Sequence, residues 1–246
     1  MRYKITIEYD GTNLLGWQKQ NEGVSVQSYL EEAILGFSHQ SVEVIAAGRT
    51  DAGVHAISQV AHFDLETSMD VFHIREAINA RLRILEAPVS VINVEEAGDD
   101  FHARFSAKGR GYIYRILNRR APTVLLKNRV WCVGYPLDVE QMRQGAQYLL
   151  GNHDFSSFRG AGCQAKSPIK TLDKLDIVVN GDEIDFIVEA RSFIYHQVRN
   201  MVGTLKNVGE GKITPHDVKI ILEKKDRKYA GPTAPACGLY LNKVIY

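Results

Sequence analysis

One carboxylate stands out because of the residues around it. The stretch "AAGRTDAGVHA", residues 46–56, places Asp51 two positions after Arg49 and among small residues. A nearby cation favours the ionised form of a carboxylate, and small neighbours leave room for a substrate. An ionised carboxylate of this kind can act as a nucleophile or as a base. The same triplet also suits an ordinary turn, in which Asp51 caps the backbone or pairs with Arg49.

The backbone around Asp51 must turn sharply if the side chain is to lie at the end of a strand. "VEVIAA", residues 42–47, is expected to form that strand, and Gly48 and Gly53 flank the triplet. Glycine adopts turn conformations that other residues avoid. We therefore expect these two glycines to shape the loop.

A metal site is a weaker interpretation of the same region. Asp51, His55 and His62 are close in sequence, but their spacing matches no common zinc motif. The three cysteines of the chain are far apart and include no C-x-x-C pair. We expect neither a metal site nor a disulfide.

The whole chain has the composition of an ordinary globular protein. It has 246 residues, of which 45% are hydrophobic and 24% charged, so one or two domains are expected. Charges interrupt every apolar run near the N-terminus, which argues against a signal peptide or a membrane span. We expect a cytoplasmic protein without a membrane association.

The net charge of +1 conceals an uneven distribution. Residues 102–129 contain no Asp or Glu, and Tyr112 and Tyr114 lie among their cations. The cations of this acid-free strip are Arg104, Lys108, Arg110, Arg115, Arg119, Arg120, Lys127 and Arg129. A second acid-free stretch, 190–209, carries Arg191, Arg199 and Lys206. Such a composition suits a phosphate backbone with stacked bases, and a solvated surface is the alternative.

Hydrophobic periodicity predicts the elements that position these residues. Strands are expected at 2–9, 42–47, 58–65, 89–97, 109–118 and 238–246, with a hairpin that turns at Asn180-Gly181. Helices are expected at 25–37, 70–82, 138–150 and about 193–209, and a shorter one should begin near Thr214.

The order of these elements predicts an α+β fold. We expect two similar halves around a mostly antiparallel mixed sheet, with a central basic cleft. The N-terminal half should span 1–118 and carry the Asp51 loop, 119–137 should be a basic linker, and 138–246 should form the C-terminal half.

Six stretches, in this order, resemble the tRNA pseudouridine synthase A family. They are "EYDGTNLLGWQKQ", "AAGRTDAGVHA", "DDFHARFSAKGRGYIYRI", "HDFSSFR", "RSFIYHQVRNMVGTL" and "GLYL". The resemblance runs from residue 3 nearly to the end of the chain. One segment departs from it: "NARLRILEAPVSV" stands where the family usually has Asn-x-x-Leu-Pro, so the proline comes later, at Pro88.

The resemblance implies the pseudouridine synthase fold and an isomerase. Its targets would be the uridines at positions 38, 39 and 40 in the anticodon stem and loop of tRNAs. The reaction detaches uracil through N1 and rejoins it through C5, so no cofactor is expected. The resemblance also implies a homodimer that binds tRNA across both subunits.

The resemblance assigns roles to individual residues. Asp51 would be the catalytic carboxylate, which attacks the sugar, attacks the base or removes a sugar proton. Arg199, in "HQVRN", would supply a positive charge beside it. Tyr112 would contact the flipped uracil and could assist removal of the C5 proton, while Arg49 would help to flip the nucleotide. The RNA backbone would be held by Arg104, Lys108, Arg110, Arg119 and Arg120.

Two other classes of protein remain open at this point. A non-catalytic tRNA-binding protein could share the scaffold, although such a protein has no use for the "GRTDAGVHA" carboxylate. A hydrolase of glycosidic bonds usually needs a second carboxylate, and the sequence offers no clear partner for Asp51.

Overall fold

The computed structural model describes all 246 residues. The chain divides into two compact units: Met1–Lys108 together with Tyr240–Tyr246, and Gly109–Leu239. Each unit combines helices with mixed and mostly antiparallel strands, so the α+β prediction is confirmed. None of the helices is both long and apolar enough to cross a membrane.

The first unit is built on strands in the order β4-β1-β3-β10, with β2 paired to β3. Their bounds are β1 Arg2–Tyr9, β2 Ile45–Ala46, β3 His55–Asp64, β4 Val89–Ala97 and β10 Leu239–Ile245. All of these pairs are antiparallel except that of β10 with β3. Residues of β1 alternate between buried positions and half-buried or exposed ones, as expected for a strand with one covered face.

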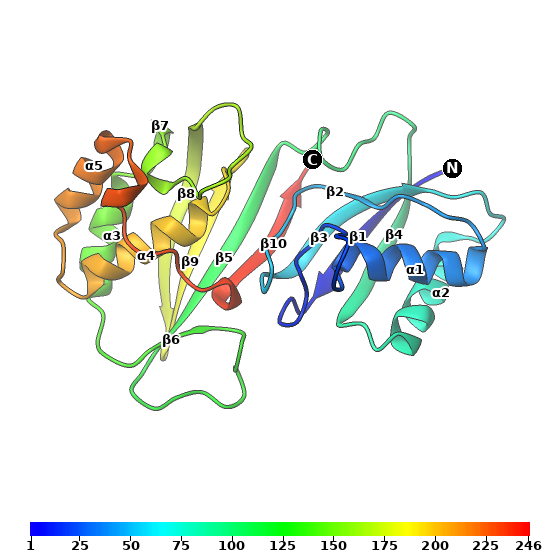
Figure 1. The fold of residues 1–246 in the computed structure, drawn as a ribbon, viewed down its shortest axis with the longest axis horizontal. Coiled ribbons are helices and arrows are strands. Elements are labelled where there is room, and N and C mark those ends of the chain that lie inside the picture. Colours follow the sequence, from blue (N-terminus) through cyan, green and yellow to red (C-terminus); the bar gives the residue numbers. More distant parts are fainter. The chain divides into compact units, whose positions relative to one another are not determined.

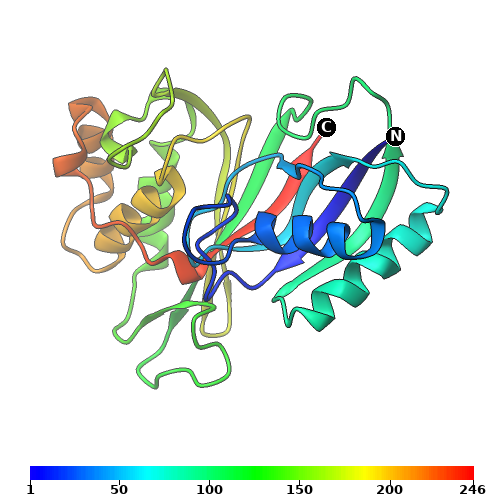
Figure 2. The same ribbon diagram turned by 45° about the vertical axis from the view of Figure 1, so that its right-hand side comes forward.

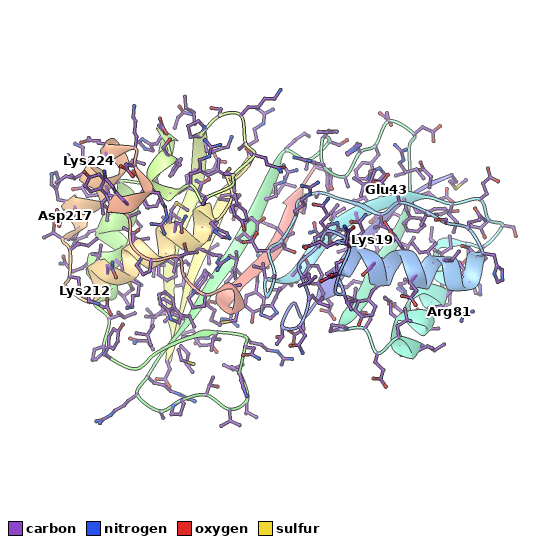
Figure 3. The ribbon with its side chains drawn as sticks, in the orientation of Figure 1. Lys19, Glu43, Arg81, Lys212, Asp217 and Lys224 are labelled. Atoms are coloured by element: carbon purple, nitrogen blue, oxygen red, sulfur yellow. The ribbon has the colours of Figure 1, made fainter.

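Two helices lie side by side against one face of these strands, as Figures 1 and 2 show: α1, Val26–Ser38, and α2, Val71–Ile84. Ser25 caps α1 and exchanges hydrogen bonds with Ser28, which fixes the start of the helix where the sequence predicts it. Arg81 of α2, labelled in Figure 3, lays its side chain over Gly36 of α1. The absent side chain of Gly36 therefore lets the two helices approach.

The second unit has strands in the order β5-β9-β8-β7, with β6 parallel to β5. Their bounds are β5 Gly109–Asn118, β6 Trp131–Val133, β7 Gly151–Asp154, β8 Ile169–Asn180 and β9 Glu183–Ala190. The predicted hairpin joins β8 to β9, and Gly181 in its turn has a φ of 59°. This left-handed conformation explains the glycine.

Three helices pack together in the second unit (Figure 1): α3, Val139–Gln147; α4, Gln197–Gly209; and α5, Pro215–Lys224. Three short 3-10 helices accompany them: η1 Ser156–Phe158, η2 Arg227–Tyr229 and η3 Ala236–Gly238. Thr214 caps α5 through a reciprocal pair of hydrogen bonds with Asp217, a residue labelled in Figure 3. The start of α5 is therefore where the sequence predicts it.

The unit boundaries differ from the predicted halves. Strand β5 belongs to the second unit, where it pairs along its length with β9. The last strand, β10, belongs mostly to the first unit, because Tyr240 and Leu241 pair with His55 and Ala56 of β3. The expected linker 119–137 contains β6, which pairs with β5.

Some element ends also differ from the predicted ones. The helix expected from about 193 begins at Gln197, because His196 has a φ of 62° and cannot continue a helix. The strand expected at 42–47 is reduced to Ile45–Ala46, and α3 ends at Gln147 instead of at 150.

Candidate functional site

The loop that carries Asp51 connects β2 to β3, as the sequence predicts. Thr50 is buried, and its hydroxyl oxygen lies 2.8 Å from the hydroxyl oxygen of Tyr9. Asp51 is half-buried and Arg49 is exposed. Thr50 therefore anchors the middle of the Arg49-Thr50-Asp51 triplet. The side chains of Arg49 and Asp51 stay accessible on this unit.

A second loop, which follows β1, clamps the Asp51 loop through the main chain. The amide of Trp17 donates to the carbonyl of Thr50 at 3.0 Å. The amide of Gly53 donates to the carbonyl of Leu14 at 3.4 Å. The stretch "DGTNLLGW" thus positions the aspartate loop, a role that the sequence analysis did not assign.

Two glycines allow the two loops to lie so close. A Cβ added at Gly11 would overlap the carbonyl of Val54. A Cβ added at Gly16, where φ is 90°, would overlap the carbonyl oxygen of Thr50 and lie 2.8 Å from the carbonyl carbon of Asp51. Both positions require glycine because backbone meets backbone there. We call this contact of residues 11–17 with the Asp51 loop the clamp; at Gly16 it packs against the main chain of Thr50 and Asp51.

The two glycines that flank the triplet differ from each other. Gly53 has a φ of 77°, so its predicted role in the turn is confirmed. The chain also bends at Gly48, but its φ is not in the left-handed region, so the conformation there does not require glycine. No atom lies within 4 Å of the position that a Gly48 side chain would take, and its carbonyl accepts a hydrogen bond from Gln59 at 2.8 Å. Gly48 leaves open space beside Arg49.

The two histidines near Asp51 bind protein groups. The amide of Gly11 donates to Nδ1 of His55 at 3.1 Å, and the amide of Ala103 donates to Nδ1 of His62 at 3.2 Å. Burial lowers the pKa of His62 below its ordinary value, so the ring is neutral at pH 7. No group of three or more His, Cys, Asp or Glu side chains is placed to hold a metal ion.

Tyr112 lies on β5 in the second unit, opposite Val188 of β9. Its ring is half-buried and meets the ring of Phe193 edge to face, with centroids 5.1 Å apart and an interplanar angle of 88°. Phe193 therefore fixes the orientation of the tyrosine, and part of the ring stays accessible.

Arg199 lies on α4 of the same unit and is held by the chain near residue 234. Its Nε donates to the carbonyl of Ala234 at 2.8 Å, and the amide of Ala234 donates back to the carbonyl of Arg199 at 3.1 Å. The hydroxyl of Tyr114 donates to the next carbonyl along the chain, that of Pro235, at 2.8 Å. Arg199 and Tyr114 therefore bind adjacent carbonyls, and Tyr114 shares one face of β5 with Tyr112.

The residue after Arg199 on α4, Asn200, takes part in a network of hydrogen bonds. Asn200 is fully buried; its amide nitrogen donates to the carbonyl of Phe158 at 2.8 Å, and its amide oxygen accepts from the hydroxyl of Thr233 at 2.6 Å. A Cβ at Gly203 would overlap the carbonyl of Pro232. These residues were not predicted from the sequence, although Asn200 and Gly203, three positions apart on one helix, could have indicated that another segment packs closely there.

The proposed RNA-binding cations divide between the two units. Arg104 and Lys108 are exposed in the first unit. Arg119 and Arg120 are exposed in the second, whereas Arg110 is half-buried and donates to the carbonyl of Arg191 at 3.0 Å.

Three residues of the acid-free stretches are not placed for RNA. Tyr114 is fully buried and donates its hydroxyl to the carbonyl of Pro235 at 2.8 Å. Arg115 binds the two carboxylate oxygens of Asp185 at 2.8 and 2.7 Å. Lys206 is buried and pairs with Glu210. Asp185 neutralises Arg115, and Glu210 neutralises Lys206. Both acidic partners lie outside the acid-free stretches, so the runs of charge along the sequence did not reveal these pairs.

Comparison with known proteins decides the family. The family described as "tRNA pseudouridine synthase" matches residues 5–106 and 146–246, which is most of the chain. The chain belongs to the tRNA pseudouridine synthase family. As a member of this family it is an isomerase that makes pseudouridine, and its α+β architecture agrees with the pseudouridine synthase fold.

Relatives that match across the whole chain support the same conclusion. A protein named tRNA pseudouridine synthase A from Paramagnetospirillum magneticum is 54% identical over 245 residues, which cover 100% of this chain and 95% of the relative. The protein of the same name from Ehrlichia chaffeensis is 52% identical over 247 residues and is covered completely, as is this chain. The resemblance seen in the six sequence stretches is therefore confirmed.

A much more distant similarity exists among solved structures. A chain of a Cbf5-Nop10-Gar1 complex aligns with a TM-score of 0.38 and 11% identity, over 97% of this chain and 48% of that chain. This similarity is too low for a conclusion about fold or function.

Proposed function

We propose that this enzyme converts the uridines at positions 38, 39 and 40 in the anticodon stem and loop of tRNAs into pseudouridine, with Asp51 as the catalytic carboxylate. The observation that carries the assignment of Asp51 is the clamp on its loop, in which Gly11 and Gly16 let a second backbone hold the aspartate. A reacting group fixed in advance lowers the entropic cost of reaching the transition state. The relatives named tRNA pseudouridine synthase A support tRNA as the substrate.

The reaction breaks the bond between N1 of uracil and C1′ of ribose and forms a bond between C5 and C1′. C5 loses a proton and N1 gains one, so atoms and electrons balance without a cofactor. Asp51 would attack the sugar, attack the base or take a sugar proton, and each of these roles requires its ionised form. Arg199 would supply positive charge that favours this form. We also propose that the enzyme acts in the cytoplasm as a homodimer.

The uridine must leave its stack before it can react, at a cost of a few kcal/mol. The accessible part of the Tyr112 ring would receive the flipped uracil, since stacking of a base on an aromatic ring contributes about 1 to 3 kcal/mol. Arg49, which is exposed beside Asp51, would occupy the space that the nucleotide leaves.

Removal of the Tyr112 hydroxyl separates stacking from chemistry. Tyr112→Phe keeps the ring against Phe193, so tRNA affinity should stay within about threefold. The turnover number should fall roughly 100-fold, the lower end of what general acid–base catalysis contributes, because the hydroxyl would no longer assist proton transfer. Steady-state kinetics with a tRNA transcript would measure both. Tyr229→Phe, at an exposed tyrosine of η2, is the matched control. Unchanged turnover would remove any role for the Tyr112 hydroxyl.

The exposed cations would position the RNA through its phosphates. In this proposal, Arg104, Lys108, Arg110, Arg119 and Arg120 contact the tRNA backbone. Arg119 and Arg120 follow β5 on the long loop that leads to β6 (Figure 1).

Replacement of Arg119 and Arg120 together by alanine should weaken tRNA binding and flatten its dependence on salt. The slope of log K against log salt concentration should decrease by roughly one to two, because each phosphate contact releases about one counterion. Titrations at several salt concentrations would show this change. The double variant Lys219→Ala/Lys224→Ala on α5 removes the same charge elsewhere in that unit. An equal effect in both double variants would place the RNA elsewhere.

The proposed activity is tested by the fate of uridine in an unmodified tRNA transcript. After incubation with the protein, digestion to nucleosides and mass spectrometry should find pseudouridine and no free uracil. Released uracil would indicate a glycosidic hydrolase, and unchanged uridine in a tRNA that still binds would indicate a binding protein.

A further inference from the structure

The segment before β5, residues 101–106, forms a turn that hydrogen bonds anchor to the first unit. Ala103 is fully buried, its amide donates to Nδ1 of His62 at 3.2 Å, and its carbonyl accepts from the hydroxyl of Tyr246 at 2.8 Å. The ends of the turn are joined by a hydrogen bond of 2.9 Å from the amide of Ser106 to the carbonyl of His102. The residues after Ala103 are therefore presented outward from a fixed anchor.

Phe105 is the most exposed aromatic residue on this turn, with 77% of its surface accessible. The ring of His102 packs against it at a centroid distance of 4.3 Å and an interplanar angle of 35°, and His62 packs against His102 at 4.8 Å. The three rings form a row of tilted contacts, with interplanar angles of 59° and 35°, that begins at the buried His62 and ends at Phe105. The outer end of this aromatic row is open to solvent, although full exposure of a phenylalanine is unfavourable.

Cations lie close to this aromatic row. The guanidinium carbon of Arg104 lies 5.8 Å from the centroid of the Phe105 ring, and Lys108 is exposed a few residues later. No Asp or Glu occurs between Phe101 and Leu137. An aromatic ring beside arginine is the usual platform on which a protein stacks a nucleobase and binds the adjacent phosphate.

A second exposed phenylalanine on the same unit provides a comparison. Phe72, 56% exposed, has the guanidinium of Arg75 at 5.2 Å from its ring centroid. Its neighbour His73 meets it edge to face, at 89°, and pairs with Asp70, while Arg75 pairs with Glu76. The residue types are the same, but His73 meets Phe72 edge to face, and the carboxylates of Asp70 and Glu76 pair with His73 and Arg75, so an RNA phosphate would be repelled there.

We propose that Phe105, supported by His102, stacks on a base of the RNA substrate other than the target uridine, and that Arg104 and Lys108 bind the neighbouring phosphates. This inference rests on the proposed function, because it assumes that the substrate is an RNA. The platform would set the position of the tRNA and would take no part in bond making, so it should affect affinity and not the chemical step.

The test compares three variants by tRNA affinity and by the single-turnover rate at saturating enzyme. Phe105→Leu keeps an apolar side chain but loses the aromatic face, and its dissociation constant should rise roughly 5- to 100-fold. Phe105→Trp should bind as tightly as the wild type or more tightly, because it keeps the aromatic face. Phe72→Leu should bind as the wild type does. All three should keep the single-turnover rate within about threefold, and a merely structural role of Phe105 would not be rescued by tryptophan.

Equal affinities of Phe105→Leu and Phe72→Leu for tRNA would overturn the inference. A change of oligomeric mass in Phe105→Leu by sedimentation, with unchanged tRNA affinity, would also overturn it and would assign the ring to a contact between protein chains. Both outcomes are measured as tRNA affinity or oligomeric mass of the variants. They are therefore distinct from failure of the proposed function, in which the wild type forms no pseudouridine.

Discussion

Asp51→Asn is expected to abolish pseudouridine formation and to leave tRNA binding nearly unchanged. The amide has the size of the carboxylate but carries no negative charge, so it can serve neither as a nucleophile nor as a base. Loss of a residue with such a role commonly lowers the rate by about 10⁴-fold or more. Release of tritium from tRNA that carries uridine labelled at C5 would measure the remaining activity.

Glu43→Gln is the matched control, because it makes the same chemical change at an exposed carboxylate of the same unit, labelled in Figure 3. It should release tritium at the wild-type rate. A substantial rate for Asp51→Asn would contradict the assignment. A loss of tRNA affinity as large as the loss of activity would instead assign Asp51 to binding.

Gly16→Ala is expected to have the second largest effect, although Gly16 is far from Asp51 in sequence. The alanine would require a left-handed conformation at φ 90° and would overlap the backbone of Thr50 and Asp51. The strain costs about 1 to 3 kcal/mol, and a displacement of the Asp51 loop by about 1 Å could lower the rate about 100-fold. Thermal unfolding and tritium release, measured together, would separate the two effects.

Gly211→Ala controls for backbone strain alone. Gly211 also has a positive φ, 71°, but no atom lies within 4 Å of the position of an added Cβ. This variant should lose some stability and keep its activity. For each variant, the loss of activity is compared with the decrease in melting temperature. If this ratio were the same for Gly16→Ala and Gly211→Ala, the loop after β1 would not position the catalytic loop.

The parts of the fold that depend on neighbouring residues were predictable from sequence. The helix starts at Ser25 and Thr214 and the turn at Asn180-Gly181 depend on local residues, and the structure places all three where expected. The loop position of Asp51 after a strand was predictable for the same reason.

The parts that depend on distant partners were not predictable. Strand β10 pairs with β3 although Tyr240 and its partner His55 are 185 residues apart in the sequence, and no local pattern specifies such a partner. The alternation of β5 showed that Tyr112 and Tyr114 share a face but not that Tyr114 is buried. Gly11 and Gly16 resemble ordinary turn glycines until the Asp51 loop is seen against them.

The most direct test of the proposed activity is a map of pseudouridine at single-nucleotide resolution in unmodified tRNA transcripts that have been incubated with the purified protein. We expect pseudouridine at positions 38, 39 and 40 wherever these carry uridine, and at no other position. Modification outside the anticodon stem and loop would contradict the proposed site. Transcripts that bind the protein and remain unmodified would contradict the proposed activity itself.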